Sequence, residues 1–593
     1  MAVLPFDAVP ADSTNSPFAE GVAEEIHDQL GRNPKLRLVG RTSAEVFRDS
    51  DADAPTIGKK LHVAYLLDGT VRRAGNQVKV AVALVRASDG IELWRHSYSG
   101  KLDDIFAIQQ SIGQQVEGQL RAQFVGTKGV TPSTLATSGE VYGYYLTARG
   151  LARDFEAAKV ETAIDLLHRA LKLDPNYAPA WAQLAIATRY RGYLQGKLAD
   201  EDAERVREQA IGIANKAIAL APQLAEAHLA KAIALEALDD TGDEGKSELL
   251  IAARLDPNNA DTLAELGQVY QWVGYFPEEL AAQRRRVQID PLWSPGLFHA
   301  AELAWQLGYE DESWNYIRQV ERNSPGSSDA HLLRAAAAYR SGNLSDALKE
   351  GLIARKVGGA GDRRFADRQI AQALRAAGLL DRARPLWYFD VDDRLWALWK
   401  GEALPGPTIN QLYRNIRVAW ANQMMTFAVL KTLVAAGRSA EAVSLYHRRF
   451  SSAEDMLRYP SGHLGLLEDG STIALALSDS GQKNAAQHLL KLLRREADDR
   501  IARGPVPRNY HYYYAMVLAV SGDNEGALRS LEQSVRRGWY YAEEKSLPDL
   551  AMEPAFRSLL QQKRFQRIVN QQRTWQEQER AKIGPLLNQV GQT

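Results

Sequence analysis

The residues most able to do chemistry in this sequence do not occur at catalytic spacings. The 593 residues contain no Gly-x-x-x-x-Gly-Lys-Ser/Thr loop, no His-Glu-x-x-His and no Gly-x-Ser-x-Gly. Acidic pairs occur at Asp392 and Asp393 and at Asp498 and Asp499, but adjacent helix residues point in different directions. The absence of cysteine excludes thiolate metal sites and cysteine nucleophiles. We therefore expect no enzymatic activity, no cofactor and no metal.

Two groups of aromatic residues are better candidates for a binding role. One lies at 387–389 and continues through Trp396, Trp399, Tyr413 and Trp420; the other is the His-Tyr-Tyr-Tyr run at 511–514. Either group could line a pocket for a small molecule or a partner. The alternative is interior packing, because large aromatic side chains often fill irregular seams.

Composition and charge exclude some classes of partner. The chain is 45% hydrophobic and 24% charged, with a formal net charge of -1. The basic runs at 284–286 and 494–495 are short and lie in helical patterns, so we expect no direct nucleic-acid binding. No run of 18 apolar residues and no leader pattern occurs. Because Met1 directly precedes an expected core strand, we expect that an upstream portion has been removed.

The middle of the chain repeats with a fixed period. Pro257 and Pro291 are 34 residues apart, and Pro325 follows after another 34. Gly274, Gly308 and Gly342 are also spaced 34 residues apart, and each follows one of these prolines. Since Gly accepts a left-handed helix cap and Pro cannot continue a helix, each unit is predicted to be helix, turn, helix, turn. Such units must stack to bury their apolar faces, which predicts a helical array.

The first 125 residues change period as an α/β domain does. Strands are expected at 2–9 and 36–40, followed by a hairpin at 63–85 and another strand at 91–98, with helices at 17–31 and 102–124. The predicted fold is an α/β N-terminal domain with a mixed sheet, followed by an all-α tetratricopeptide-like solenoid. The predicted bounds are 1–125 for the domain, 126–140 for a linker, 141–358 for regular repeats and 359–593 for divergent helical repeats with a C-terminal cap. We expect the helix beyond Gln571 to be exposed.

Two stretches resemble known families. The sequences at 2–6, 18–26, 38–43, 65–78 and 92–109 resemble the TolB-amino-terminal-like domain. That domain recurs in CadC-like (ToxR-type) membrane-bound transcriptional regulators and in some bacterial adenylate cyclases with tetratricopeptide tails. The sequences at 145–150 and 163–181 are similar to the first tetratricopeptide unit of the same regulators. The resemblance implies no catalytic group in the α/β domain.

The resemblance to tetratricopeptide units also suggests a binding groove. Aligned on the prolines, successive units start at Ala260, Ser294 and Ser328. The groove-facing positions of their first helices are Gln268, Gln271, Trp272, Phe298, Glu302, Trp305, Gln306, Tyr339 and Arg340. Aromatic side chains beside amides suit a peptide or an amphipathic helix. The alternative is that Trp272 and Trp305 only fill gaps between repeats.

One departure from the repeat pattern concerns packing. Glu279 stands where the second helix of the unit usually has a small residue, which puts tight packing there in doubt.

The resemblance implies a non-enzymatic sensor and protein-interaction region of a bacterial regulator. It would bind a partner protein, a peptide or a small ligand and relay this to a missing N-terminal output domain. DNA binding and membrane attachment would belong to the parent protein, with this region in the periplasm. The alternatives are a soluble cytoplasmic scaffold for protein assembly, or the accessory region of a nucleotide cyclase. An exposed sheet edge would allow a homodimer.

Overall fold

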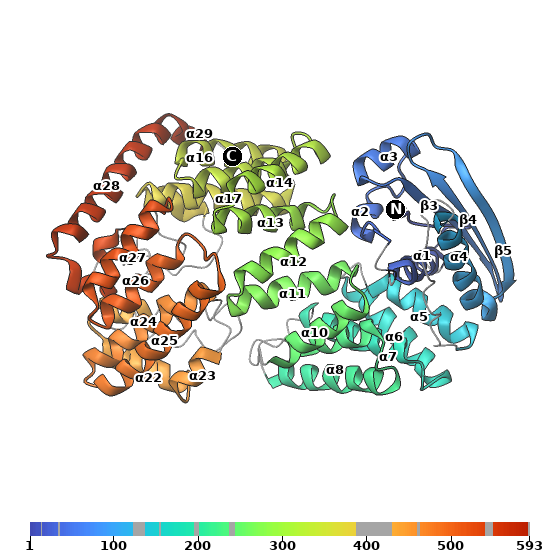
Figure 1. Cartoon of the computed structure of the whole chain (residues 1–593), viewed down its shortest axis with the longest axis horizontal. Coiled ribbons are helices and arrows are strands. Elements are labelled where there is room, and N and C mark those ends of the chain that lie inside the picture. The colour runs from blue at the N-terminus through green and yellow to red at the C-terminus, as the bar shows by residue number, and fades with distance from the viewer. Residues whose placement is uncertain are drawn as a thin grey trace. The chain divides into compact units, whose positions relative to one another are not determined.

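The computed structural model describes residues 1–12, 15–31, 33, 36–121, 137–152, 156–194, 201–235, 243–386, 430–458, 463–539 and 549–590 (Figure 1). They form two compact units. The first unit is Met1–Val269 with Ala282–Gly296, and the second is Tyr270–Ala281 with Leu297–Thr593. The aromatic group expected at 387–420 lies outside the described residues.

The first unit begins with a mixed sheet, as the sequence predicts. Its strands are β1 Ala2–Val3, β2 Asp7–Ala8, β3 Tyr65–Ala74, β4 Gln77–Arg86 and β5 Glu92–Lys101. β1 and β2 both pair with β3 in parallel, while β3, β4 and β5 are antiparallel neighbours. The hairpin pairs Ala74 with Gln77 around Gly75, whose φ of 57° favours glycine. The expected hairpin is therefore confirmed.

Helices cover the sheet. They are α1 Asn15–Gly31, α2 Arg41–Glu45, α3 Ala54–Leu61 and α4 Ile105–Arg121, with the 3-10 turn η1 Leu102–Asp104 before α4. Val80 and Val82 of β4 share a core with Phe18 and Ile26 of α1 and Ile112 of α4. A second apolar cluster places residues of α3 against β1 and β3. The alternation of buried residues along β4 fits a strand with one face on this core.

One expected strand is absent from the described sheet. Residues 36–40 are not assigned to a strand, although two bonds join them to Met1: the amino terminus donates to the Arg37 carbonyl at 2.6 Å, and Val39 N–H donates to the Met1 carbonyl at 2.9 Å. The next amide, Gly40 N–H, instead donates to the Ile289 carbonyl at 2.6 Å, and α2 starts at Arg41. The strand prediction was wrong because the chain turns here toward the repeat helices.

The rest of the first unit consists of helix pairs. These are α5 Gly139–Ala152, α6 Ala157–Leu173, α7 Ala178–Leu194, α8 Glu201–Leu220, α9 Ala225–Leu235 and α10 Asp243–Leu255. The next two helices, α11 Ala260–Val273 and α12 Phe276–Ile289, contribute residues to both units. α5 begins at Gly139, two residues before residue 141, where the sequence predicts that the repeats begin.

The second unit continues the helix pairs. Its helices are α13 Ser294–Leu307, α14 Glu310–Asn323, α15 Ser328–Arg340, α16 Leu344–Val357, α17 Ala360–Ala376, α18 Leu380–Ala383, α22 Ser439–Arg449, α23 Ala453–Arg458, α24 His463–Asp479, α25 Lys483–Arg503, α26 Tyr510–Val520, α27 Asn524–Arg536, α28 Lys563–Ile583 and α29 Leu587–Val590. Short 3-10 turns are η2 Arg384–Leu386, η3 Leu550–Met552, η4 Pro554–Leu559 and η5 Gly584–Leu586. Among the described residues, no helix is both long and apolar enough to span a bilayer.

The same backbone turn recurs at the glycines. Gly274, Gly308 and Gly342 have φ values of 73°, 92° and 77°. In each case the next residue donates its N–H to the carbonyl five positions back, as Tyr309 does to Ala304 at 2.8 Å. Gly378, Gly437, Gly481 and Gly522 repeat both features. Because this turn ends a helix without needing a proline, the helix pairs continue in the part of the chain beyond Pro325, where the 34-residue proline spacing is lost.

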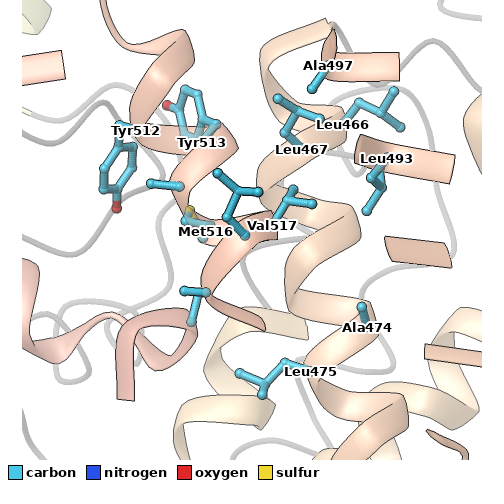
Figure 2. Packing of buried hydrophobic residues seen from close by; sticks show 14 of the residues in the cluster. Leu466, Leu467, Ala474, Leu475, Leu493, Ala497, Tyr512, Tyr513, Met516 and Val517 are labelled. Atoms are coloured by element: carbon cyan, nitrogen blue, oxygen red, sulfur yellow. The ribbon is translucent and has the colours of Figure 1, made fainter. Parts of the chain in front are cut away.

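The largest core of the second unit lies among the later helix pairs. Its helices bury apolar side chains against one another, as Figure 2 shows for residues of α24, α25 and α26. Those labelled are Leu466, Leu467, Ala474, Leu475, Leu493, Ala497, Tyr512, Tyr513, Met516 and Val517. Leu467 and Met516 are fully buried, so these irregular repeats hold a packed interior.

The C-terminal helix matches the sequence-based expectation only in part. Residues beyond Gln571 were expected to be exposed, but Trp575 and Ile583 of α28 and Val590 of α29 pack against the apolar cluster of α15 to α18. The first half of α28 contributes Phe565 to the larger core. The expectation holds for the polar positions, most of which are exposed, but it missed the few widely spaced apolar residues that pack into two cores of the second unit.

Candidate functional site

The predicted groove residues lie on α11, α13 and α15. Gln268 belongs to the first unit, and the other eight belong to the second. Gln271, Trp272 and Gln306 are half-buried, so parts of their side chains remain open to solvent. These three residues keep the surface character that a partner-binding role requires.

An ion pair joins two of the predicted helices. Arg340 Nη2 of α15 lies 2.7 Å from Glu302 Oε1 of α13, and both side chains are about a quarter exposed. The sequence placed an acid and a base on this surface, and the structure brings them into contact.

Of the three predicted aromatic positions in α13 and α15, Phe298 is partly buried, while Trp305 and Tyr339 are buried. Trp305 is 5% exposed, and the guanidinium of Arg508 lies over its ring, 4.9 Å from the centroid. The backbone N–H of Arg508 also donates to the Gln306 carbonyl at 3.0 Å. Tyr339 is buried in the apolar cluster of α15 to α18. For Trp305 and Tyr339 the geometry fits a packing role.

Glu279 is buried although the repeat pattern has a small residue at its position. It is 1% exposed, and its Oε1 lies 3.1 Å from His299 Nε2 of α13. Burial raises the pKa of Glu279, although His299 opposes this. The interior therefore accommodates the carboxyl group through a specific partner.

The other aromatic candidate is part of the interior. His511, Tyr512 and Tyr513 lie in α26 and are buried, and the Tyr512 ring stacks on Trp539 with centroids 4.2 Å apart. The packing interpretation of this run is the one the structure supports. Within the described ranges, no cluster of His, Asp and Glu is arranged to hold a metal ion.

A buried charge cluster, which sequence reasoning missed, fixes the α/β domain to the first repeat. Arg149 of α5 is almost fully buried and forms ion pairs with three carboxylates of α1. Its Nε lies 3.3 Å from Glu24, its Nη1 lies 2.5 Å from Glu25, and its Nη2 contacts Asp28. Burial alone would raise the pKa of Asp28, but Arg149 and His27 outweigh it and hold that pKa below its usual range. The cluster makes α1 and α5 a tight pair.

Two turns of the array also hold the α/β domain. Asn258 Nδ2, next to the first repeating proline, donates to the Gly31 carbonyl at the end of α1, at 2.8 Å. Asp290, next to the second, accepts the backbone N–H of Ser43 in α2 at 2.6 Å. Leu292 N–H returns a bond to Ser43 Oγ at 2.9 Å. The sequence signal for these contacts was the polar residue beside each turn proline. It indicated that the chain turns there, but not which residues the turn contacts.

Comparison with solved structures finds other repeat proteins at low similarity. One is from a functional characterization of Pseudomonas aeruginosa pilF, 18% identical over 38% of this chain and 96% of that chain, with a TM-score of 0.30. YrrB, described as a TPR protein with an unusual peptide-binding site, is 19% identical over 34% and 95%, with a TM-score of 0.26. Yeast Tom70 is 15% identical over 64% and 75%, with a TM-score of 0.32. Such scores carry no argument here, so the repeat assignment rests on the helix pairs themselves.

Comparison with curated sequences finds a relative that matches part of the chain. A protein named putative adenylate cyclase 3, from Rhizobium meliloti (strain 1021), is 30% identical over 238 residues. The match covers 40% of this chain and 40% of the relative, so the chain spans well under two thirds of that protein. No protein-family model matches the chain. The helix pairs and strands themselves show a tetratricopeptide-like array joined to a small mixed sheet.

Proposed function

We propose that this chain is a non-enzymatic sensor and protein-interaction region that binds a peptide or helix of a partner on α11, α13 and α15. The observation that supports this most directly is the partly exposed Glu302–Arg340 ion pair, with Gln306 on the same helix as Glu302. Gln271 and Trp272 of α11 add an amide and an aromatic ring. A peptide offers both backbone polar groups and side chains to such a set.

The relay in this proposal is a shift between two arrangements of the chain. A partner changes the population of an arrangement only by as much as it binds that arrangement more tightly. The buried Arg149 cluster and the Asp290 bond tie the α/β domain to repeats of its own unit. The relayed change would therefore move the α/β domain together with those repeats, toward an output domain of a CadC-like regulator.

The second candidate is an accessory region of a nucleotide cyclase. The match to a putative adenylate cyclase over 238 residues is the specific observation that favours it. The two candidates share the partner-binding surface and differ in the output domain. The leading proposal places this region in the periplasm, and the alternative of a soluble scaffold for protein assembly places it in the cytoplasm. β5 is an edge strand of the described sheet, which supports adding a homodimer to the proposal.

A photo-crosslinking amino acid at Gln271 tests the surface in native cells. We expect one discrete adduct, and we expect Trp272→Ala to reduce its yield without changing helicity. The matched control position is Phe365 of α17, which is 61% exposed. Trp305 is unsuitable for substitution because it is buried. Equal adducts from both positions would contradict a specific surface on α11.

The output domain and location need a separate measurement. Immunoblots of fractionated native cells, with protease added to spheroplasts, report the size and side of the polypeptide. A membrane-bound band clearly heavier than 65.7 kDa that external protease removes supports the periplasmic regulator. A heavier, protected band with cyclic AMP synthesis supports the cyclase alternative. A soluble, protected band near 65.7 kDa supports the scaffold.

A further inference from the structure

Two arginines of the second unit meet at one end of the helix pair α26 and α27 (Figure 1). Arg508 stands just before α26, and Arg537 is the residue that follows α27. A Cβ at Gly538 would lie only 3.2 Å from Arg508 Nη1, so the Arg508 guanidinium reaches the residue next to Arg537. Ser534 Oγ of α27 also donates to the Arg508 carbonyl at 3.3 Å. The two arginines are therefore neighbours in space.

Arg508 is held in place but keeps part of its donor edge unused. Its Nη2 pairs with Glu310 at the start of α14, and its guanidinium lies over the Trp305 ring. Its backbone N–H donates to the Gln306 carbonyl at 3.0 Å. Within the described ranges, none of its bonds uses Nε or Nη1. The side chain is 16% exposed, so these donors are positioned and still reachable.

Arg537 carries a positive charge without an anionic partner in the described part of the chain. Its side chain is half-buried, and burial lowers the pKa of Arg537, with the charge of Arg508 adding to the effect. As the residue that caps α27, Arg537 gains from the helix dipole. That dipole amounts to only about half an elementary charge. Arg508 and Arg537 thus share one carboxylate, that of Glu310, and one positive charge is left over.

His511 adds a neutral ring beside the two arginines. It is 5% exposed, and its ring makes no hydrogen bond to any described residue. Its backbone carbonyl accepts a bond from Ser530 Oγ at 2.7 Å, which fixes this turn of α26 on α27. Burial lowers the pKa of His511 to about 4, and the charge of Arg537 lowers it further. The imidazole is therefore neutral near pH 7 and has one N–H to donate.

Two buried indole groups add to the donors of this region. Trp305 lies under Arg508, and Trp539 follows Arg537 by two residues and stacks on Tyr512. The indole N–H of each is buried and has no acceptor among the described residues. Indole and guanidinium groups donate hydrogen bonds and cannot accept them. Because buried donors nearly always have acceptors, their accumulation here points to a ligand that supplies them.

We propose that Arg508, Arg537 and His511 form a binding site for a carboxylate group. One carboxylate balances the charge that Glu310 leaves over, and its two oxygens fit the planar fork of a guanidinium. His511 N–H can donate a further bond to the same group. A phosphate dianion would instead bring a second negative charge close to Glu310, which repels it. The site lies outside α11 and α15, and it does not require the partner-binding proposal.

Two sources can present this group. One is a free small carboxylate, and the other is an acidic side chain of a protein partner. The site adjoins the proposed partner-binding surface, because the Arg508 backbone bonds Gln306 of α13. An acidic side chain could therefore enter the site from a partner that lies on that surface. The experiment below separates the two sources.

Thermal unfolding of the full chain in sodium acetate, compared with sodium chloride at equal ionic strength, tests the site. We expect acetate to raise the midpoint by about 2–4 °C once its concentration is several times its Kd. Arg537→Gln should abolish this difference between the two salts. Arg536→Gln is the matched control, because it removes the same charge from the adjacent, exposed residue of α27 and should keep the difference.

A second variant should change acetate binding in the opposite direction. Glu310→Gln removes the carboxylate that pairs with Arg508, so two guanidinium groups become available to the ligand. We expect its affinity for acetate to rise at least about threefold, seen as a larger midpoint difference at the same acetate concentration. A purely structural role of these side chains predicts no such gain. The variant also guards against misfolding, because its expected result is stronger binding.

The possible outcomes separate the alternatives. The absence of an acetate effect in the wild-type chain would overturn the proposal, as would an equal effect in Arg537→Gln. A larger Arg537-dependent effect of phosphate than of acetate would overturn the carboxylate assignment. If the site is confirmed, a lower Gln271 crosslink yield in Arg537→Gln than in Arg536→Gln assigns the carboxylate to the partner, and equal yields assign it to a free ligand. If the wild-type chain gives no crosslink, the partner-binding proposal fails, while the acetate measurement still decides the site.

Discussion

The indole N–H of Trp575 in α28 donates to the backbone carbonyl of Gly342, 3.1 Å away, in the turn between α15 and α16. In the same turn, Leu344 N–H donates to Glu579 Oε2 at 2.8 Å. At the turn between α17 and α18, Arg580 Nε donates to the Ala377 carbonyl at 2.9 Å. α28 therefore binds the helix-pair turns themselves, and its polar side chains satisfy backbone groups that a free turn would expose to water.

Replacing Trp575 by alanine should loosen this contact. The variant loses a partly buried ring and one hydrogen bond, and we expect the free energy of local opening to fall by about 2–4 kcal/mol. Hydrogen-exchange mass spectrometry should show faster exchange in α16 and α28. Trp314→Ala, at a 38% exposed position of α14, should leave α28 unchanged. If α28 exchanges at the wild-type rate in Trp575→Ala, the indole contact does not hold it.

Gly21 marks a close approach between α1 and α5. A Cβ at this position would lie 2.6 Å from the Leu146 carbonyl oxygen, a distance that requires the backbone to move. Gly21→Ala is expected to destabilise the first unit by about 1–3 kcal/mol, a typical cost of overpacking. Gly118→Ala in α4 is the matched control, because no heavy atom lies within 4 Å of its added Cβ. The control should be neutral or stabilising by up to about 1 kcal/mol in thermal unfolding. Equal midpoints for the two variants would contradict the close packing.

Glu226 should make the junction sensitive to pH. It accepts a hydrogen bond from Tyr145 O–H at 3.2 Å, and burial raises the pKa of Glu226 to about 7, against the opposing charge of Arg149. An unfolded Glu has a pKa of about 4.3, so the folded chain holds the extra proton between about pH 4.3 and 7. The contribution of Glu226 to stability therefore falls as pH rises through this window.

Glu226→Gln should remove that dependence. We expect its thermal midpoint to exceed that of the wild type by about 2–4 °C near pH 8, with no gain near pH 4.5. Glu140→Gln is the control, because exposed Glu140 accepts a similar bond from Tyr144 at 3.1 Å. A gain of the same size at both pH values would show that the effect does not come from titration of Glu226.

Lys431 is a buried cation between two buried carboxylates. Its Nζ lies 2.7 Å from Glu468 Oε1 and 2.6 Å from Glu553 Oε2. These carboxylates raise the pKa of Lys431, although burial opposes them. Lys431→Met leaves both acids without this partner, and we expect a loss of about 3–5 kcal/mol in the unfolding of the second unit.

Two further variants identify the cause of that loss. Adding Glu468→Gln and Glu553→Gln to Lys431→Met should recover part of the stability, because the uncompensated charge is gone. Lys159→Met breaks an exposed pair with Glu156 and should cost less than about 1 kcal/mol in chemical denaturation. Full stability of the single Lys431 variant would show that the triad does not stabilise the core.

The sequence by itself determined the repeating elements. The spacing of Gly274, Gly308 and Gly342 depends on local physics, because a residue with positive φ ends a helix wherever it stands. The hairpin around Gly75 is equally local. Such features need only a few neighbouring residues, so pattern and turn chemistry are sufficient to predict them.

Only the tertiary structure decided which surfaces remain open. Trp305 is covered by Arg508, and Trp575 binds Gly342, across separations of about 200 residues that no local pattern encodes. Arg149 likewise finds its carboxylates on α1, more than 100 residues earlier. Burial and ion pairing depend on which segments meet, and that meeting is a property of the whole folded chain. For this reason the sequence predicted the helices on which we propose a binding surface, while the fold determined which of the predicted residues remain exposed.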